Sequence, residues 1–106
     1  MSSLSDLVSE HGIASEMYEV VRTYEIYLNG NDTPRPLRVK ILRGDDDRFT
    51  PSLSHAVQKP GWATPYSPSW HPGETIEEAE DQVYSYIVTS YKPEDRGAKW
   101  EPNELF

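Results

Sequence analysis

Apolar and polar residues alternate between residues 37 and 43, which is the pattern of a β-strand with one buried face. Leu37, Val39 and Ile41 are the apolar positions, and successive side chains of a strand point to opposite faces of its sheet. The earlier stretch 18–28 is rich in β-branched and aromatic residues, which favour strands. Both stretches are therefore predicted to be strands of one small antiparallel sheet.

Turn-forming residues around these strands indicate where the chain reverses. Asparagine, glycine and proline are concentrated in residues 29–34, and three aspartates follow Gly44. Such residues favour turns because they accept unusual backbone angles or end strand pairing. A third, weaker strand is expected from Arg48 to about Val57. Pro51 within it cannot donate a backbone hydrogen bond, so this strand is expected at a sheet edge or at a bulge.

The clearest local signal is a helix start at Thr75. In a capping box the Thr75 hydroxyl accepts a hydrogen bond from the Glu78 amide, and the Glu78 carboxylate reaches back to the Thr75 amide. Apolar residues, among them Val83, Tyr86 and Ile87, then recur at helical spacing until Pro93 ends the pattern. A helix over 75–91 is therefore predicted, with its apolar side on the sheet. A shorter helix over 3–11 is expected before the first strand.

These elements predict an α+β fold of order α-β-β-β-α. About three antiparallel strands form a small sheet, and the 75–91 helix packs on one of its faces. The 106 residues fit one domain, which we expect to span residues 1–93. The remaining segment, 94–106, carries Trp100 and Phe106. Two arrangements stay open for this C-terminal tail: docked through its aromatic rings, or flexible.

The charge of the chain bears on its partners. There are 18 acidic and 10 basic residues, and the formal net charge is -8. Such a charge repels phosphate backbones, so direct nucleic-acid binding is not expected, whereas a basic protein partner is favoured. The element order resembles that of double-stranded RNA-binding domains, which need lysines at the start of the last helix. Glu77 and Glu78 stand there instead, which argues against RNA binding of that kind.

The chain has no cysteine, which excludes disulfides, thiol catalysis and cysteine-ligated metals, and which fits a reducing compartment. Its first residues lack the basic start and the apolar core of a signal peptide. No apolar run approaches the ~20 residues that a membrane span needs. We therefore expect a cytoplasmic protein without a membrane partner.

No motif in the sequence indicates catalysis. Serine, histidine and aspartate all occur, but without a nucleophile elbow or a comparable supporting motif. His11, His55 and His71 lack the i, i+4 spacing of helical metal ligands, and Asp45–Asp47 lacks the alternating ligands of a calcium loop. We expect a protein that is not an enzyme and that needs no metal or cofactor.

The main candidate site is the long loop 58–73. It contains four prolines together with Trp62, Tyr66 and Trp70. Tryptophan and tyrosine commonly anchor protein partners, but a small domain also needs its large rings to cover its core. Both interpretations, a binding surface and a lid on the core, stay open.

Three further groups of residues are candidates for protein binding. They are the basic Arg38, Lys40 and Arg43 of the second strand, the acidic Glu77 and Glu78 of the helix start, and the aromatic Trp100 and Phe106 of the tail. The competing interpretations of the basic group are cross-strand pairing with Glu25 and neighbouring carboxylates, and protection of an edge strand. The competing interpretation of the acidic group is stabilisation of the helix dipole.

These observations favour a non-enzymatic, acidic protein-binding module that acts as a regulator, inhibitor or adaptor. One alternative is an acidic mimic of nucleic acid that inhibits a host or phage-defence nuclease. Another is a small-ligand or hydrolytic domain that uses the aromatic loop as a pocket, with His55 or His71 as acid–base group. A homodimer formed through an exposed second or third strand is also left open.

Overall fold

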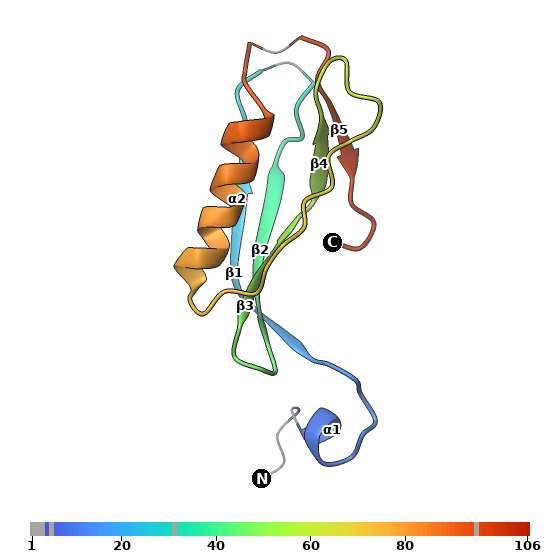
Figure 1. Ribbon diagram of the computed structural model, residues 1–106, viewed down its shortest axis with the longest axis vertical. Helices are drawn as coiled ribbons and strands as arrows, with labels where there is room; N and C mark the ends of the chain where they lie inside the picture. Colours follow the sequence, from blue (N-terminus) through green and yellow to red (C-terminus); the bar gives the residue numbers. More distant parts are fainter. Residues whose placement is uncertain (1–3, 5, 31, 95) are drawn as a thin grey trace.

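The alternating segment forms β2 (Leu37–Gly44), which is the central strand of a three-stranded sheet. The structure, a computed structural model, describes residues 4, 6–30, 32–94 and 96–106. β1 (Tyr18–Ile26) and β3 (Phe49–Leu53) pair with the two edges of β2, both antiparallel. Helix α2 (Ile76–Ser90) packs against β3 and β2 (Figure 1). The predicted α+β class, with a three-stranded antiparallel sheet and a helix on one face, is confirmed.

The core lies between α2 and the apolar face of β2. Leu37 and Ile41 are fully buried, and Val39 is 2% exposed. The buried residues of α2 are Ala79, Val83, Tyr86 and Ser90. Removing the apolar side chains of this core from water is the main force that holds the helix on the sheet.

The third strand is shorter than predicted, because the chain leaves the sheet at Ser54. β3 ends at Leu53, and the next strand, β4 (His55–Gln58), belongs to a second sheet. The Ser54 amide donates to the Arg38 carbonyl (2.9 Å), and the Ser54 hydroxyl accepts from the Arg38 amide (2.9 Å). These bonds give the backbone amide and carbonyl of Arg38 hydrogen-bond partners at the point where β3 leaves β2. The predicted single strand over 48–57 is therefore wrong, since it is two strands in different sheets.

The C-terminal segment is docked on the domain through the second sheet. β5 (Lys99–Pro102) pairs antiparallel with β4 (Figure 1), and the Asn103 amide donates to the Ser54 carbonyl (2.8 Å). Trp100 meets Tyr91 edge-on, with ring centroids 5.3 Å apart. The last residues of the chain thus hold the place where β3 and β4 diverge.

Thr75 caps α2 as predicted, but only half of the capping box has the predicted form. The Thr75 hydroxyl accepts from the Glu78 amide (3.1 Å). The Glu78 carboxylate accepts from the Glu74 amide (2.7 Å) and not from that of Thr75. Gly73 permits this contact, because a Cβ at residue 73 would lie 2.9 Å from the Glu78 carboxylate.

The N-terminal helix is also shorter than predicted. α1 covers Asp6–Ser9, whereas the prediction was 3–11, of which residues 3 and 5 lie outside the described residues. Figure 1 shows α1 beyond the start of β1, away from the sheet, and the side chains of Leu4 and Ile13 are 73% and 77% exposed. A short helix without a surface to pack on gains little stability from its apolar residues, so it does not extend.

Candidate functional site

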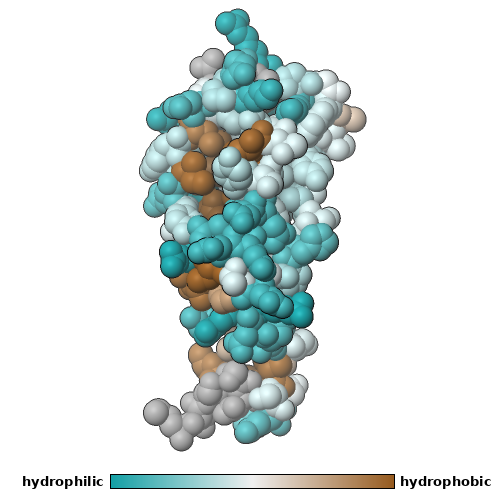
Figure 2. Space-filling view, turned by 60° about the vertical axis from the view of Figure 1, so that its left-hand side comes forward, coloured by the Kyte–Doolittle hydropathy of each residue, from teal (hydrophilic) through white to brown (hydrophobic). Residues whose placement is uncertain are grey.

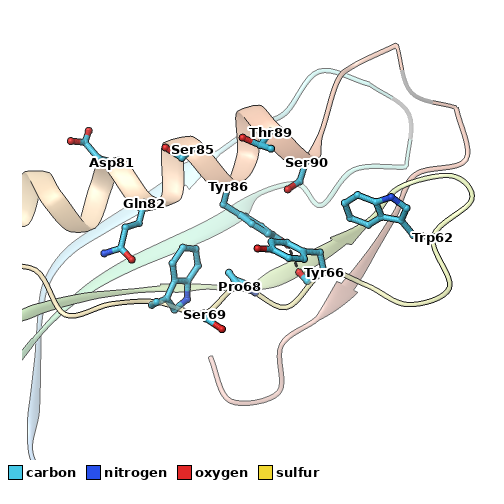
Figure 3. A pocket seen from close by; sticks show the side chains of 11 residues that line it. Trp62, Tyr66, Pro68, Ser69, Asp81, Gln82, Ser85, Tyr86, Thr89 and Ser90 are labelled. Carbon is cyan, nitrogen blue, oxygen red and sulfur yellow. Dashed lines mark hydrogen bonds between the residues drawn. The ribbon is translucent and has the colours of Figure 1, made fainter.

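The long loop after β4 and one side of α2 enclose a groove of about 630 Å³, which we name the aromatic groove (Figure 3). The loop contributes Trp62, Tyr66, Pro68, Ser69 and Trp70 to its lining. The helix contributes Asp81, Gln82, Ser85, Tyr86, Thr89 and Ser90. The structure therefore brings the three aromatic residues of the loop together over α2.

Tyr86 is the centre of this cluster of rings. The Tyr66 ring stacks on it, with centroids 5.4 Å apart and planes at 20°, and the Trp70 ring meets it edge-on at 5.8 Å. Trp62 in turn lies edge-on to Tyr66, with centroids 6.1 Å apart. Stacked and edge-on pairs are the favoured arrangements of aromatic rings. The rings thus form a connected series that runs from a buried helix residue to the exposed loop.

The hydroxyl of Tyr86 ties the loop to the second sheet. It donates to the Tyr66 carbonyl (2.6 Å) and accepts from the Val57 amide (3.1 Å). The Tyr66 amide donates to the Val57 carbonyl (2.8 Å). Burial raises the pKa of Tyr86 above its usual value, because the charged phenolate is poorly solvated there. The hydroxyl therefore stays protonated and able to donate at neutral pH.

Side-chain amides fix the rest of the loop. Gln82 of α2 contacts the His71 backbone twice: its Oε1 accepts from the His71 amide (2.9 Å), and its Nε2 donates to the His71 carbonyl (2.7 Å). Gln58 of β4 donates to the Trp62 carbonyl (2.6 Å). At the end of the loop, Gly73 exchanges two backbone hydrogen bonds of 2.8 Å with Phe49 of β3. The loop is thus held at several points along its length.

The three loop aromatics differ in exposure. Trp70 is half-buried and packs against the core, as a lid would. The side chains of Trp62 and Tyr66 are 39% and 51% exposed, and their rings border the groove. The loop therefore covers the core with one ring and presents two others to solvent.

The helix wall of the groove is polar and carries one acidic side chain. Residues four apart on a helix lie on the same side, so Asp81, Ser85 and Thr89 form one row, and Glu77 continues this row toward the start of α2. Among the described lining residues of the groove, Asp81 is the one that bears a charge at neutral pH. Glu78, the other acidic candidate, holds the Glu74 amide.

The basic candidates of β2 have different neighbours. Arg43 pairs with Glu19 of β1 (2.8 Å), and both side chains are largely exposed, so this ion pair contributes little stability. Arg38 lies opposite Glu25 in the strand register. Lys40 donates to the Phe106 carbonyl (3.1 Å) and covers the Phe106 ring, 4.0 Å from its centroid.

The two aromatic candidates of the tail lie apart from the aromatic groove. Trp100 packs on Tyr91 and the core, and Phe106 lies against Lys40 of β2. Both rings therefore have contacts within the fold, and neither lines the groove.

Ser54 and His55 are the closest approach to a catalytic pair. The Ser54 hydroxyl lies 2.7 Å from His55 Nδ1, and burial lowers the pKa of His55 below its usual value of 6.5. However, Ser54 is 9% exposed, and its hydroxyl also accepts from the Arg38 amide. The Ser54 hydroxyl thus already has two polar neighbours at the junction of β3 and β4, where it stabilises the fold.

Sequence reasoning missed two residues of the site. Tyr86 was predicted only as part of the apolar side of α2, and Gln82 was not singled out. Their spacing of four residues places them on one side of the helix, which was the available signal. What the spacing does not reveal is that the loop backbone supplies their hydrogen-bond partners.

Comparison with known proteins gives no family for the chain. No family model, curated protein or solved structure matches it. In the described part of the chain, no three or more histidine or acidic side chains are grouped to hold a metal ion. Neither described helix is long and apolar enough to cross a membrane.

Proposed function

We propose that the protein is a non-enzymatic protein-binding module that captures its partner in the aromatic groove. The observation that carries this proposal is the presence of two partly exposed rings, Trp62 and Tyr66, on a loop fixed by hydrogen bonds. Tryptophan and tyrosine are enriched among the residues that dominate binding energy. A loop that is already ordered loses less conformational entropy when a partner binds.

The charge of the groove favours a basic partner. Asp81 lies in the helix wall and Glu77 one turn earlier on the same side of α2, within a chain of net charge -8. Complementary charge speeds association and favours the correct partner. We propose that the module acts as a regulator, inhibitor or adaptor. We also propose a cytoplasmic location, which the absence of cysteine supports.

The test is capture of a partner from a nuclease-treated lysate of the native host by wild-type protein and by W62A/Y66A. The variant should fold normally and lose the partner, because both rings are partly exposed at the groove. Tyr27→Ala is the matched control, since Tyr27 is 61% exposed and does not line the groove. Equal capture by W62A/Y66A and wild type, with both shown to be folded by circular dichroism, would refute the proposed site.

Salt distinguishes this function from the acidic nucleic-acid mimic. A partner held by the rings should stay bound when the salt is raised to about 1 M, where charge interactions are screened beyond about 3 Å. A partner that is lost steeply with salt, and that W62A/Y66A still captures, would instead favour the mimic.

The hydrolytic alternative has less support, because neither His55 nor His71 lines the aromatic groove that it would use as a pocket. It requires that His55 or His71 act on a bound ligand. Histidine resonances of the protein that move on addition of a hydrolysable ester, together with release of its product, would support that alternative over the binding module.

A further inference from the structure

A second groove lies on the other side of α2, between the helix and β1. It has a volume of about 390 Å³, and we name it the apolar groove. Its lining consists of Tyr24, Glu25, Ile26, Leu28, Val39, Glu80, Val83, Tyr84, Ile87 and Val88. Figure 2, turned toward the α2 side, shows hydrophobic atoms that reach the surface between hydrophilic regions.

β1 offers the free edge of the three-stranded sheet. β2 is enclosed between β1 and β3, and β3 already pairs with Gly73 at Phe49. Within the described residues, no strand pairs with the outer edge of β1 along Tyr18–Ile26. The expectation that the second strand offers an exposed edge is therefore wrong. An open edge of this length carries backbone donors and acceptors that another strand can use.

The apolar groove adjoins this edge directly. Tyr24 of β1 donates to Glu80 of α2 (2.8 Å), so one hydrogen bond spans the groove from strand to helix. On the helix side, Tyr84 and Val88 are 68% and 53% exposed. A strand laid along β1 would point alternate side chains toward α2, where this apolar lining would cover them.

The charge of the apolar groove indicates which kind of strand can bind there. Glu25 and Glu80 lie in the lining, and the described lining residues include no lysine or arginine. A second copy of the chain would bring its own carboxylates and a further net charge of -8 to the same edge. Like charges disfavour that pairing, whereas a basic segment is attracted.

We propose that β1 and the apolar groove bind an extended, basic segment of another protein by strand addition. Alternate apolar side chains of the segment enter the groove, and the lysine or arginine residues between them point to the other face of the sheet, near Glu25. Backbone hydrogen bonds to an edge strand provide the attachment in this mode, and the groove selects the side chains. The site is separate from the aromatic groove and does not depend on the function proposed for it.

The test is an NMR titration of the full chain with a synthetic nonapeptide in which valine alternates with lysine and threonine. Amide signals of β1 and of residues 83–88 should shift, while those of residues 62–70 stay in place. Two peptides with methylated backbone amides provide the control. In one of them the amides along one edge of the extended peptide are methylated, and in the other the amides along the opposite edge are methylated. One form should bind like the parent and the other about tenfold or more weakly, because strand addition uses only one edge.

Two exposed positions of α2 provide matched variants. Val88→Lys puts a cation into the apolar groove and should weaken peptide binding by about tenfold or more, through repulsion of the basic segment. Thr89→Lys adds the same charge one residue later, on the side of the aromatic groove, and should bind the peptide nearly as well as wild type.

Three outcomes would overturn the proposal. One is the absence of shifts in β1 up to millimolar peptide, and another is equal binding of both N-methylated forms. The third is a dimer in sedimentation that Val88→Lys dissociates, because a second copy would then be the occupant of the groove.

Discussion

The two sides of α2 present different kinds of surface. On one side Tyr86 and Gln82 hold a loop by hydrogen bonds to its backbone, and the rings there are fixed in orientation. On the other side Val83 and Ile87 border the apolar groove, next to the outer edge of β1, which pairs with no strand of the described residues. One side therefore suits recognition by ordered side chains, and the other suits recognition through a backbone edge.

The largest difference between the two sides of α2 is expected when Tyr86 is removed. Tyr86→Ala deletes a ring that is 6% exposed and the hydroxyl that joins the loop to β4. Truncation of a large buried ring costs about 3–5 kcal/mol, so the free energy of unfolding in urea should fall by that amount. Tyr84→Ala, on the other side of α2 and 68% exposed, should change it by less than about 0.5 kcal/mol. Equal losses in the two variants would contradict the central role of Tyr86.

Removal of single tyrosine hydroxyls tests how much the hydrogen bonds on each side of α2 contribute to stability. Tyr86→Phe leaves the Val57 amide and the Tyr66 carbonyl without this partner, and an unpaired buried group costs about 1–3 kcal/mol. Tyr24→Phe removes only the partly buried bond to Glu80 and should cost about 0.5–1.5 kcal/mol. Urea unfolding of both variants measures the difference. A larger loss for Tyr24→Phe would show that the apolar side depends more on its hydrogen bond than the aromatic side does.

The elements that border the apolar groove were predictable because their signals are local. The alternation of Leu37, Val39 and Ile41 predicts β2, and the Thr75 cap predicts where α2 begins. The apolar residues of β1 and α2 show which sides face the core. The start of β1 and the bounds of α2 follow from residues close together in the chain. The groove between these two elements was not predicted, because β1 and α2 lie far apart in the sequence.

The aromatic groove was predictable only in part. Its loop aromatics stand out in composition, but their arrangement depends on β4, which pairs with a strand far away in the sequence. The residues around Ser54 do not show that β3 ends there, because the Ser54 hydroxyl accepts its hydrogen bond from Arg38, which belongs to another strand. Non-local pairing of this kind decides whether Tyr66 meets Val57, and so whether the loop is ordered.

A smaller effect is expected from Gln82→Ala, which frees the loop without emptying the core. The two hydrogen bonds to His71 are exposed, so stability should fall by only about 1 kcal/mol. Hydrogen exchange of the His71 amide should speed up by about tenfold, because local opening becomes easier. Ser85→Ala, on the same wall of the groove, is the control and should leave this exchange unchanged. Unchanged exchange in Gln82→Ala would mean that other contacts order the loop.

The smallest expected effect is a pH dependence of stability that comes from His55 and that affects the aromatic side of α2. Burial lowers the pKa of His55 below 6.5, so the fold favours its neutral form. The stability contributed by this histidine is complete above the unfolded pKa and is lost as the pH falls through the folded pKa. His55 begins β4, whose Val57 amide holds Tyr86, whereas the described lining of the apolar groove contains no histidine.

Urea unfolding of wild type and His55→Gln at about pH 7.5 and about pH 5.5 isolates this contribution from the carboxylates, which titrate in both proteins. Wild type should lose more stability between the two pH values than the variant does. Exchange of the Tyr66 amide, which bonds to Val57, should speed up at the lower pH in wild type more than in the variant. Parallel losses in the two proteins would show that protonation of His55 does not weaken the second sheet.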